Sequence, residues 1–415
     1  MVNNLFFKLN IFLIILIPIA LITGPFLPDL MISISGIITI YYLIKRKFNS
    51  FLFNHYIIKF LLVFYLYILI LSLFSSNIIL SLESSLFYFR FIFFSLTIYF
   101  LLTHYKKFKI YFFYILLFTI LIVSTDGVVE FFLNVNFLSL FNYDIYISSA
   151  STHSRLSSLF RDEWVIGSYL VRLMPILIYL YLNINLGKNL KKIFFLTIFL
   201  SSLAIILSGE RAALIYLFLL FFIFSIFYIK KIKKYKLFIF LPVLFLIFLI
   251  PLLNDKLKNR VMHGFENYTS LNIENNIYLK YYDSSIKMFL DKPFFGHGPK
   301  MFRVVCKKYI QNDTNYGCST HPHNNYVQLL GETGFIGFLF LLISFIYFTT
   351  NLFKFFLFDN QYDLKKYLSS VVLLILFIIN LQPLIPTNNF FGNWINIFYY
   401  LPLGFYLHSL EKDNY

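Results

Sequence analysis

The chain has 415 residues, of which 59% are hydrophobic and 13% are charged. An ordinary soluble domain is about 25% charged, so this composition excludes a soluble globular enzyme and indicates a membrane protein. The formal net charge of +16 lies largely in short connections between apolar segments, which is typical of a cytoplasmic rim and argues against nucleic acid as a partner.

The apolar segments have the length of membrane-spanning helices. A hydrocarbon core about 30 Å thick needs about 20 apolar residues per crossing, and twelve segments meet this requirement. In chain order they are residues 5–23, 26–44, 57–76, 84–103, 109–126, 165–183, 193–208, 212–229, 237–253, 335–356, 367–384 and 393–409. The first has no small-residue cleavage site, so we interpret it as a retained helix. The pattern predicts an all-α polytopic membrane protein with a single membrane domain over residues 1–415.

The basic residues of the short connections predict the orientation, because Lys and Arg stay on the cytoplasmic side. Lysine clusters occur in alternate connections, around residues 45–47, 106–109, 188–192, 230–236 and 354–366. The intervening short connections are almost free of them. Both termini are therefore predicted to be cytoplasmic, and two long connections, 127–164 and 254–334, are predicted to lie outside the cytoplasm.

The longer outer connection, 254–334, has elements of its own. A helix is predicted from about Ile277 to Leu290, followed by a Gly-His-Gly-Pro turn. The loop also carries Arg260 and Arg303, in a region too long for the positive-inside rule to explain. These cations indicate either solubility and attraction to anionic head groups, or a site for a phosphorylated lipid.

Both cysteines of the chain, Cys306 and Cys318, fall in this loop. A disulfide persists only in an oxidising compartment, so an outer location makes a bridge between them possible. The alternative is two unpaired thiols.

The stretch STHPHNNYVQLLGETGFIGF, at the end of the same loop, concentrates polar groups ahead of an apolar segment. Proline suits the first turn of a helix, so we expect a helix from near Pro322 with His323 in its first turn. A neutral imidazole there could act as a general base for a hydroxyl group, although a hydrogen-bonded interfacial histidine is the plainer interpretation. His321 and His323 form only a weak zinc signal, because no well-spaced partners accompany them.

The residues that follow are expected to serve structure. Asn325, Gln328 and Glu332 share a helix face away from His323, and we interpret them as structural polar contacts. Gly334 and Gly337 would allow another backbone or a ligand to approach closely.

Several arginines in or next to apolar segments are the remaining candidates for functional residues. Arg211, in LSGERAALIYL, could grip phosphate oxygens or could pair with Glu210. Arg90 and Arg172 lie within predicted spans, where internal ion pairs explain a charge as well as chemistry does. Arg155 lies in the first outer loop.

Several of these segments resemble a known family. His323 and Asn324, nine further residues, Gly334, two residues and Gly337 resemble the histidine signature of the O-antigen ligase and polymerase superfamily of bacterial envelope glycosyltransferases. RLSSLFRDEWVIGSYL, SGERAAL and DKPFFGHGPKMFRVVC resemble accompanying segments. Twelve spans with a long, partly helical outer loop before the tenth match the family's layout.

The resemblance implies a function in the bacterial inner membrane. A glycan would be transferred from undecaprenyl diphosphate to an acceptor hydroxyl on the periplasmic face, without a metal or other cofactor. His323 would be the essential histidine near the acceptor, and Arg211 a diphosphate-binding arginine. Arg260, Arg303 and Arg155 are weaker candidates for the diphosphate, and Asn324, Gly334 and Gly337 belong to the structural motif.

The acceptor stays open between several alternatives. A ligase would use the lipid A core, a polymerase would use a second lipid-linked glycan, and a related branch glycosylates proteins. The single dominant outer loop slightly favours a ligase, whereas the RLSSLF loop and the CSTHPHN context could equally fit a polymerase. A lipid-linked glycan transporter is less favoured, because it would place its charges at the bilayer midplane in two related halves.

Overall fold

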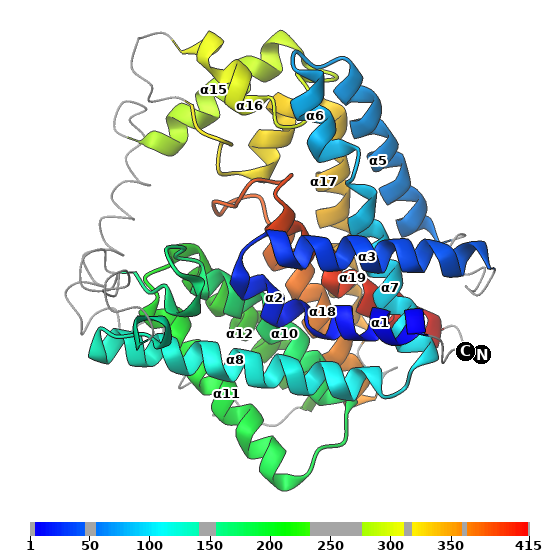
Figure 1. The fold of residues 1–415 in the computed structure, drawn as a ribbon, viewed down its shortest axis with the longest axis vertical. Coiled ribbons are helices and arrows are strands. Elements are labelled where there is room, and N and C mark those ends of the chain that lie inside the picture. The colour runs from blue at the N-terminus through cyan, green and yellow to red at the C-terminus, as the bar shows by residue number, and fades with distance from the viewer. Residues whose placement is uncertain are drawn as a thin grey trace.

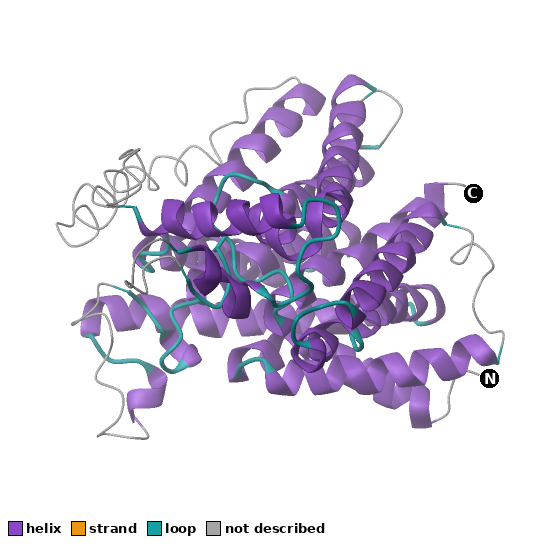
Figure 2. Ribbon diagram, turned by 90° about the horizontal axis from the view of Figure 1, so that it is seen from above, coloured by secondary structure: helices purple, strands orange, loops and turns teal. Residues whose placement is uncertain are grey.

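The computed structural model describes residues 5–45, 55–140, 155–232, 276–310, 318–358 and 363–413. In these ranges the ordered elements are all helical, joined by loops and turns (Figure 2). The predicted span 237–253 and the candidate Arg260 lie outside the described residues.

The helices follow the predicted apolar segments closely. Those before the second outer loop are α1 (Leu5–Ile15), α2 (Ile17–Ala20), α3 (Phe26–Ile44), α5 (Tyr56–Leu73), α6 (Ile78–Ser85), α7 (Phe89–His104), α8 (Phe108–Leu133), α10 (Ile166–Asn183), α11 (Lys188–Leu207) and α12 (Arg211–Ile232). Those after it begins are α15 (Ile277–Asp291), α16 (Phe302–Val305), α17 (Asn325–Leu357), α18 (Leu364–Leu381) and α19 (Asn393–Asp413). Short 3-10 turns occupy Leu21–Thr23, Phe137–Leu140, Ser158–Phe160 and Cys306–Tyr309.

Among the described residues, nine helices are long and apolar enough to cross a membrane, or ten if the bent pair at the N-terminus is one span. The prediction of an all-helical membrane protein is therefore confirmed, whereas the count of twelve is not. The segment 393–409 does form a helix, α19, but its Asn, Tyr and Trp side chains lower its hydropathy and it is not one of the nine.

The first predicted span, 5–23, is not one straight helix. Its two parts, Leu5–Ile15 and Ile17–Thr23, meet at an angle of 49°. Pro18 lies at the start of the second part. Proline lacks the backbone N–H that would continue the helical hydrogen bonding and clashes with the preceding turn, which accounts for the bend.

The helices α10 and α18 form the centre of the bundle. Nearly every side chain from Ile166 to Leu180 and from Tyr367 to Leu381 is buried. The outer helices α3, α5 and α11 instead expose large apolar side chains, as expected where a helix faces lipid. The start of α1 and the end of α19 lie at the same edge of the molecule in both views (Figures 1 and 2).

Arg90 lies in α7 and is neutralised within the bundle. Its Nε is 2.6 Å from Oδ1 of Asp29 in α3, and its Nη2 donates to Oδ1 of Asn393 at 3.0 Å. The interpretation of this arginine as half of an internal ion pair is confirmed.

The outer loop and α17 are joined at a pair of glycines. Helix α17 is broken at Gly334, which has φ +66° and ψ −169°. A Cβ there would lie 2.4 Å from the backbone of Phe294, and a Cβ on Gly296 would lie 2.6 Å from the backbone of Glu332. Only glycine permits both the left-handed φ and this approach. The break lets the backbone N–H of Phe335 donate to Pro293 at 2.8 Å.

The predicted helix of the outer loop is confirmed as α15. It packs against the first part of α17, where Ser285 Oγ donates to the carbonyl of Val327 at 2.7 Å and sits against Gly331. In Figure 1, α15 and α16 lie at the top of the molecule beside α6 and the upper part of α17. The histidine stretch contacts the connection after α18, where Asn324 Nδ2 donates to the carbonyl of Pro383 at 2.7 Å.

Candidate active site

The helix that carries the histidine motif begins later than predicted. It starts at Asn325, and Asn324 is its N-cap, with Oδ1 accepting from the backbone N–H groups of Tyr326 and Val327 at 2.9 and 3.1 Å. The predicted start near Pro322 is wrong, because His323 has φ +57°, which cannot continue a right-handed helix. An asparagine side chain also satisfies free N–H groups, which proline does not.

His323 is held in this conformation by the connection between α18 and α19. The backbone N–H of Thr387 donates to the carbonyl of His323 at 2.8 Å. Thr387 Oγ1 accepts from the backbone N–H of Asn325 at 3.0 Å and donates to Oδ1 of Asn325 at 2.9 Å. A positive φ in a residue other than glycine is strained and persists where surrounding contacts impose it. Thr387, which is buried, supplies those contacts.

The imidazole of His323 faces aromatic rings of α15. Its centroid lies 5.8 Å from that of Tyr278, 5.7 Å from that of Tyr281 and 4.1 Å from that of His321. No side chain or backbone group in the described ranges hydrogen-bonds to the ring nitrogens. Burial lowers the pKa of His323 below its usual range, so the ring is neutral near pH 7 and at least one nitrogen can accept a proton.

His321 has a different environment. Its Nδ1 lies 3.0 Å from the hydroxyl of Thr320, and its Nε2 is fully buried. Burial, helped by His323 and Arg303, lowers the pKa of His321 to about 3. Because His321 is buried and difficult to protonate, we assign it a structural role in packing. His323, in contrast, is partly exposed to solvent.

Glu332 connects α17 to the loop of α16. Its Oε1 accepts from the backbone N–H of Phe302 at 2.9 Å and its Oε2 accepts from Nε2 of Gln328 at 3.0 Å. Gln328 also donates to Asn389 at 2.8 Å, and Asn325 donates to Tyr399 OH at 2.6 Å. The interpretation of Asn325, Gln328 and Glu332 as structural polar contacts is confirmed.

Two cations of the outer loop, Lys300 and Arg303, lie near Glu332. Arg303 is half-buried in α16, and its Nε is buried without a hydrogen-bond partner among the described residues. Burial, together with Arg303, lowers the pKa of Lys300. Arg303 is also close enough to His321 to disfavour its protonation. The structure therefore places Arg303 on the histidine side of the outer loop.

Cys306 and Cys318 are joined in a disulfide, with their Cα atoms 5.6 Å apart. Cys306 packs in a small cluster with Met288 and Phe302, on the inner side of α15 and α16. The bridge ties the segment that leads into the histidine stretch to this cluster.

Arg211 and Glu210 do not pair with each other. The Glu210 carboxylate accepts from the backbone N–H and hydroxyl of Ser168, at 3.1 and 2.8 Å, and from the N–H of Gly167. It thus satisfies free N–H groups at the start of α10, with its pKa raised by burial. The predicted alternative of a Glu210–Arg211 pair is wrong, because these N–H groups compete successfully for the carboxylate.

Arg211 remains available for a ligand. It is the first residue of α12 and half-buried, and within the described residues its guanidinium has no hydrogen bond or ion pair. Arg155 has a different setting, with its guanidinium 5.4 Å from the ring of Trp164 and close enough to lower the pKa of Glu210. Arg155 therefore helps to support the turn that presents Arg211.

Arg172 is a buried cation without a carboxylate partner in the described part of the chain. Its Nε donates to Oδ1 of Asn380 at 3.1 Å and its Nη1 to the carbonyl of Ser168 at 3.0 Å. Its guanidinium also lies 5.3 Å from the ring centre of Tyr216. The expected internal ion pair is replaced here by neutral acceptors and an aromatic face.

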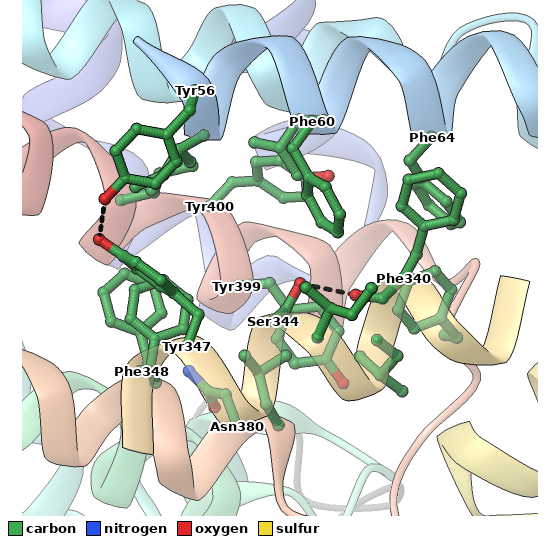
Figure 3. A pocket seen from close by; sticks show the side chains of 18 of the residues that line it. Tyr56, Phe60, Phe64, Phe340, Ser344, Tyr347, Phe348, Asn380, Tyr399 and Tyr400 are labelled. Atoms are coloured by element: carbon green, nitrogen blue, oxygen red, sulfur yellow. Dashed lines mark hydrogen bonds between the residues drawn. The ribbon is translucent and has the colours of Figure 1, made fainter. Parts of the chain in front are cut away.

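An apolar chamber of about 280 Å³, partly open to the surface, lies between α5, α17 and α19. Figure 3 shows Phe60, Phe64 and Phe340 along its length, with Tyr56 and Tyr347 hydrogen-bonded to each other at one end. Tyr399 also lines the chamber, and its hydroxyl accepts a hydrogen bond from the side-chain amide of Asn325. The hydrogen bond between Tyr399 and Asn325 thus connects the chamber to the Asn325–Thr387 contacts that hold the stretch containing His323.

The predicted site residues divide into three groups. His323, Asn324 and Arg303 lie in one neighbourhood, and Gly334 is at the break in the helix α17 that Asn324 caps. Arg211 begins α12 after the turn from α11, and Arg155 lies near Glu210 of that turn. Gly337 is helical and packs against Thr333 of its own helix. Over the described ranges, no group of three His, Cys, Asp or Glu side chains is placed to hold a metal ion.

Residues 196–342 match the family described as O-antigen ligase. They form an O-antigen ligase family domain. No curated protein matches the chain significantly. The match places an O-antigen ligase domain in a chain whose described residues include nine or ten candidate membrane spans, and this family indicates transfer of lipid-linked glycans.

The O-antigen ligase domain contains some parts of the site and not others. Arg211, Arg303 and His323 all lie inside the matched residues. Thr387 and Asn389, which hold the start of α17, lie outside them, in the connection between α18 and α19. Sequence reasoning missed this connection because it contains no charged residue, and its only signal was polarity between two apolar segments.

Proposed function

We propose that the protein transfers a glycan from undecaprenyl diphosphate to an acceptor hydroxyl of lipid A core at the periplasmic face. The observation that carries this proposal is the His323 imidazole at the mouth of a membrane helix. Burial lowers its pKa, and within the described residues its ring nitrogens have no hydrogen bond. The backbone N–H of Thr387 holds the carbonyl of the same residue. The acceptor assignment follows the dominant outer loop, 254–334, before the tenth predicted span, which slightly favours a ligase.

The proposed reaction is a direct displacement at the anomeric carbon. His323 accepts the proton of the acceptor hydroxyl as its oxygen forms the new bond to that carbon. The bond from the anomeric carbon to the diphosphate oxygen breaks, and undecaprenyl diphosphate leaves with the bonding electrons. The Thr387 N–H, which donates to the His323 carbonyl, and the Asn324 side chain, which caps α17, would keep His323 in place during this step.

Arg211 would stabilise the charge that develops on the leaving diphosphate. Arginine stays protonated and binds phosphate oxygens in pairs, and Glu210 does not neutralise it. Arg303 would add a second cation on the histidine side. Preorganised cations of this kind act on charge that appears only in the transition state.

The apolar chamber in Figure 3 suits part of the donor's hydrocarbon chain. Its lining is almost entirely aromatic and aliphatic, and it lies along α17, the helix that begins shortly after His323. A Ser344→Trp variant would fill it, and we expect a higher KM for the donor with little change in kcat. An unchanged KM would remove the chamber from the proposal.

The testing experiment is a gel of lipopolysaccharide from a strain that lacks the protein, complemented with wild type or with His323→Ala at equal expression. Naked core with long glycan retained on the lipid carrier indicates the proposed ligase. Core that bears a single repeat unit indicates a polymerase that joins lipid-linked repeat units. A normal ladder with His323→Ala would contradict the catalytic assignment in both cases.

A further inference from the structure

A second pocket lies at the far end of α10 and α18 from the histidine site. It has a volume of about 200 Å³ and is lined by the end of α10, the following loop, and one lysine from each of two helices. The lining residues are Tyr181, Leu182, Ile184, Asn185, Leu186, Lys191 and Lys365. Because a bound water needs only about 10 to 15 Å³ of such space, the pocket has room for a phosphate group.

The walls of the pocket are joined beneath it. Asn183 Nδ2 donates to Ser369 Oγ at 2.9 Å, which ties the end of α10 to the start of α18. The ring of Tyr181 stacks on Phe194 of α11 with centroids 3.9 Å apart. These contacts fix the helix ends that carry the pocket.

The two lysines give the pocket a positive charge that no carboxylate of the described residues pairs with. Neither Lys191 nor Lys365 forms an ion pair within the ranges the structure describes. Asp363 is near in sequence, but its carboxylate accepts from the backbone N–H of Lys365 at 3.2 Å, as a helix cap. The pocket therefore offers two cations from separate helices to one anionic group.

An apolar strip of α11 continues from the pocket along the bundle surface. Lys191, Phe195 and Phe199 are spaced four residues apart and so share one face of the helix. Phe195 is 52% exposed and Phe199 is 46% exposed. A cation at the helix start above an exposed aromatic strip matches a lipid, with a charged head and a hydrocarbon chain.

We propose that this pocket binds the phosphate head group of an anionic phospholipid, with Lys191 and Lys365 on the phosphate and the Phe195–Phe199 strip against one acyl chain. Basic pockets between membrane helices on the cytoplasmic side bind such head groups, and the pocket lies at the lysine-rich end that the sequence predicts to be cytoplasmic. The lipid would bridge α10, α11 and α18. This site is independent of the glycan-transfer site.

The experiment titrates phosphatidylglycerol into the purified full-length protein and follows binding by native mass spectrometry. Attraction between a lysine and an anionic head group strengthens binding several-fold for each lysine. The double variant Lys191→Gln/Lys365→Gln should therefore bind phosphatidylglycerol roughly 10- to 30-fold more weakly than the wild type. The charge-retaining Lys191→Arg/Lys365→Arg variant should bind as the wild type does. The matched control, Lys106→Gln/Lys107→Gln, removes two exposed lysines from the connection between α7 and α8 and should have little effect.

Further arms separate the lipid from free phosphate and from general charge effects. Phe195→Ser/Phe199→Ser should weaken phosphatidylglycerol binding, and inorganic phosphate should fail to displace the lipid. Displacement by phosphate would overturn the lipid assignment in favour of free phosphate. Equal losses in the pocket and control variants, or equal binding of phosphatidylcholine, would overturn the site. Equal unfolding midpoints in phosphatidylcholine nanodiscs establish that all variants are folded.

Discussion

The backbone N–H of Thr387 donates a hydrogen bond of 2.8 Å to the carbonyl oxygen of His323. This contact joins the connection before α19 to the stretch before α17, and it holds the histidine in a left-handed conformation. The position of the proposed base is therefore set by a residue remote in sequence.

Thr387→Val keeps the backbone N–H but removes the hydroxyl that bonds to Asn325. Because a displacement of about 1 Å can reduce a catalysed rate about 100-fold, we expect kcat to fall roughly 10- to 100-fold with KM nearly unchanged. Thr387→Ser restores the hydroxyl and should recover most of the rate. A kcat equal to that of wild type in Thr387→Val would show that the Thr387 hydroxyl is not needed to position His323.

The pH dependence of transfer should reflect the neutral form of His323. Burial lowers the pKa of this imidazole from an ordinary value of about 6.5, so the base stays unprotonated down to a lower pH than a free histidine would. Activity measured in reconstituted membranes should be constant from pH 8 to about 6.5 and fall only below it. A midpoint above this value would contradict the burial argument.

Arg211→Ala should reduce transfer by about 100- to 1,000-fold, the usual effect of removing a charge-stabilising group. Folding should be unaffected, because this guanidinium has no partner within the described residues. Arg211→Lys should recover part of the rate, since it keeps the charge but not the paired geometry. Normal donor turnover by Arg211→Ala would refute its role.

Glu210→Ala serves as a contrasting variant at the neighbouring position. It leaves the N–H groups of Gly167 and Ser168 without their acceptor, which costs about 1 to 3 kcal/mol. We expect a lower thermal unfolding midpoint in detergent for Glu210→Ala and not for Arg211→Ala. The reverse order would contradict the capping role assigned to Glu210.

Gly334→Ala should destabilise the protein. Its Cβ would lie 2.4 Å from the backbone of Phe294, at a φ of +66°, and strain of this type costs about 1 to 3 kcal/mol. Gly187→Ala is a matched control, because a Cβ there meets no atom within 4 Å. Thermal unfolding in detergent should separate the two variants, and equal midpoints would count against the backbone contact at Gly334.

The disulfide between Cys306 and Cys318 predicts a mass lower by two hydrogen atoms under non-reducing conditions. Its removal in Cys318→Ser should lower stability by about 2 to 4 kcal/mol and loosen the segment before His321. Mass spectrometry of protein alkylated before reduction measures the free thiols. Two alkylated cysteines in the native protein would exclude the bridge.

The sequence by itself determined the class of protein and the local elements. Apolar length gives the membrane helices, and the glycine-rich turn after α15 follows from residues that favour a positive φ, as Gly296 and Gly298 do. The motif around His323 was also visible. These features depend on neighbours in the chain, so a sequence pattern is sufficient to predict them.

Only the tertiary structure decided which partner each polar group takes. Glu210 could have bonded to Arg211 beside it but caps α10 instead, and Asn324 rather than Pro322 begins α17 because Thr387 holds His323 outside the helix. A buried polar group bonds to whichever donor or acceptor packing brings near. The partner depends on segments that are remote in the chain, so the local sequence cannot predict it.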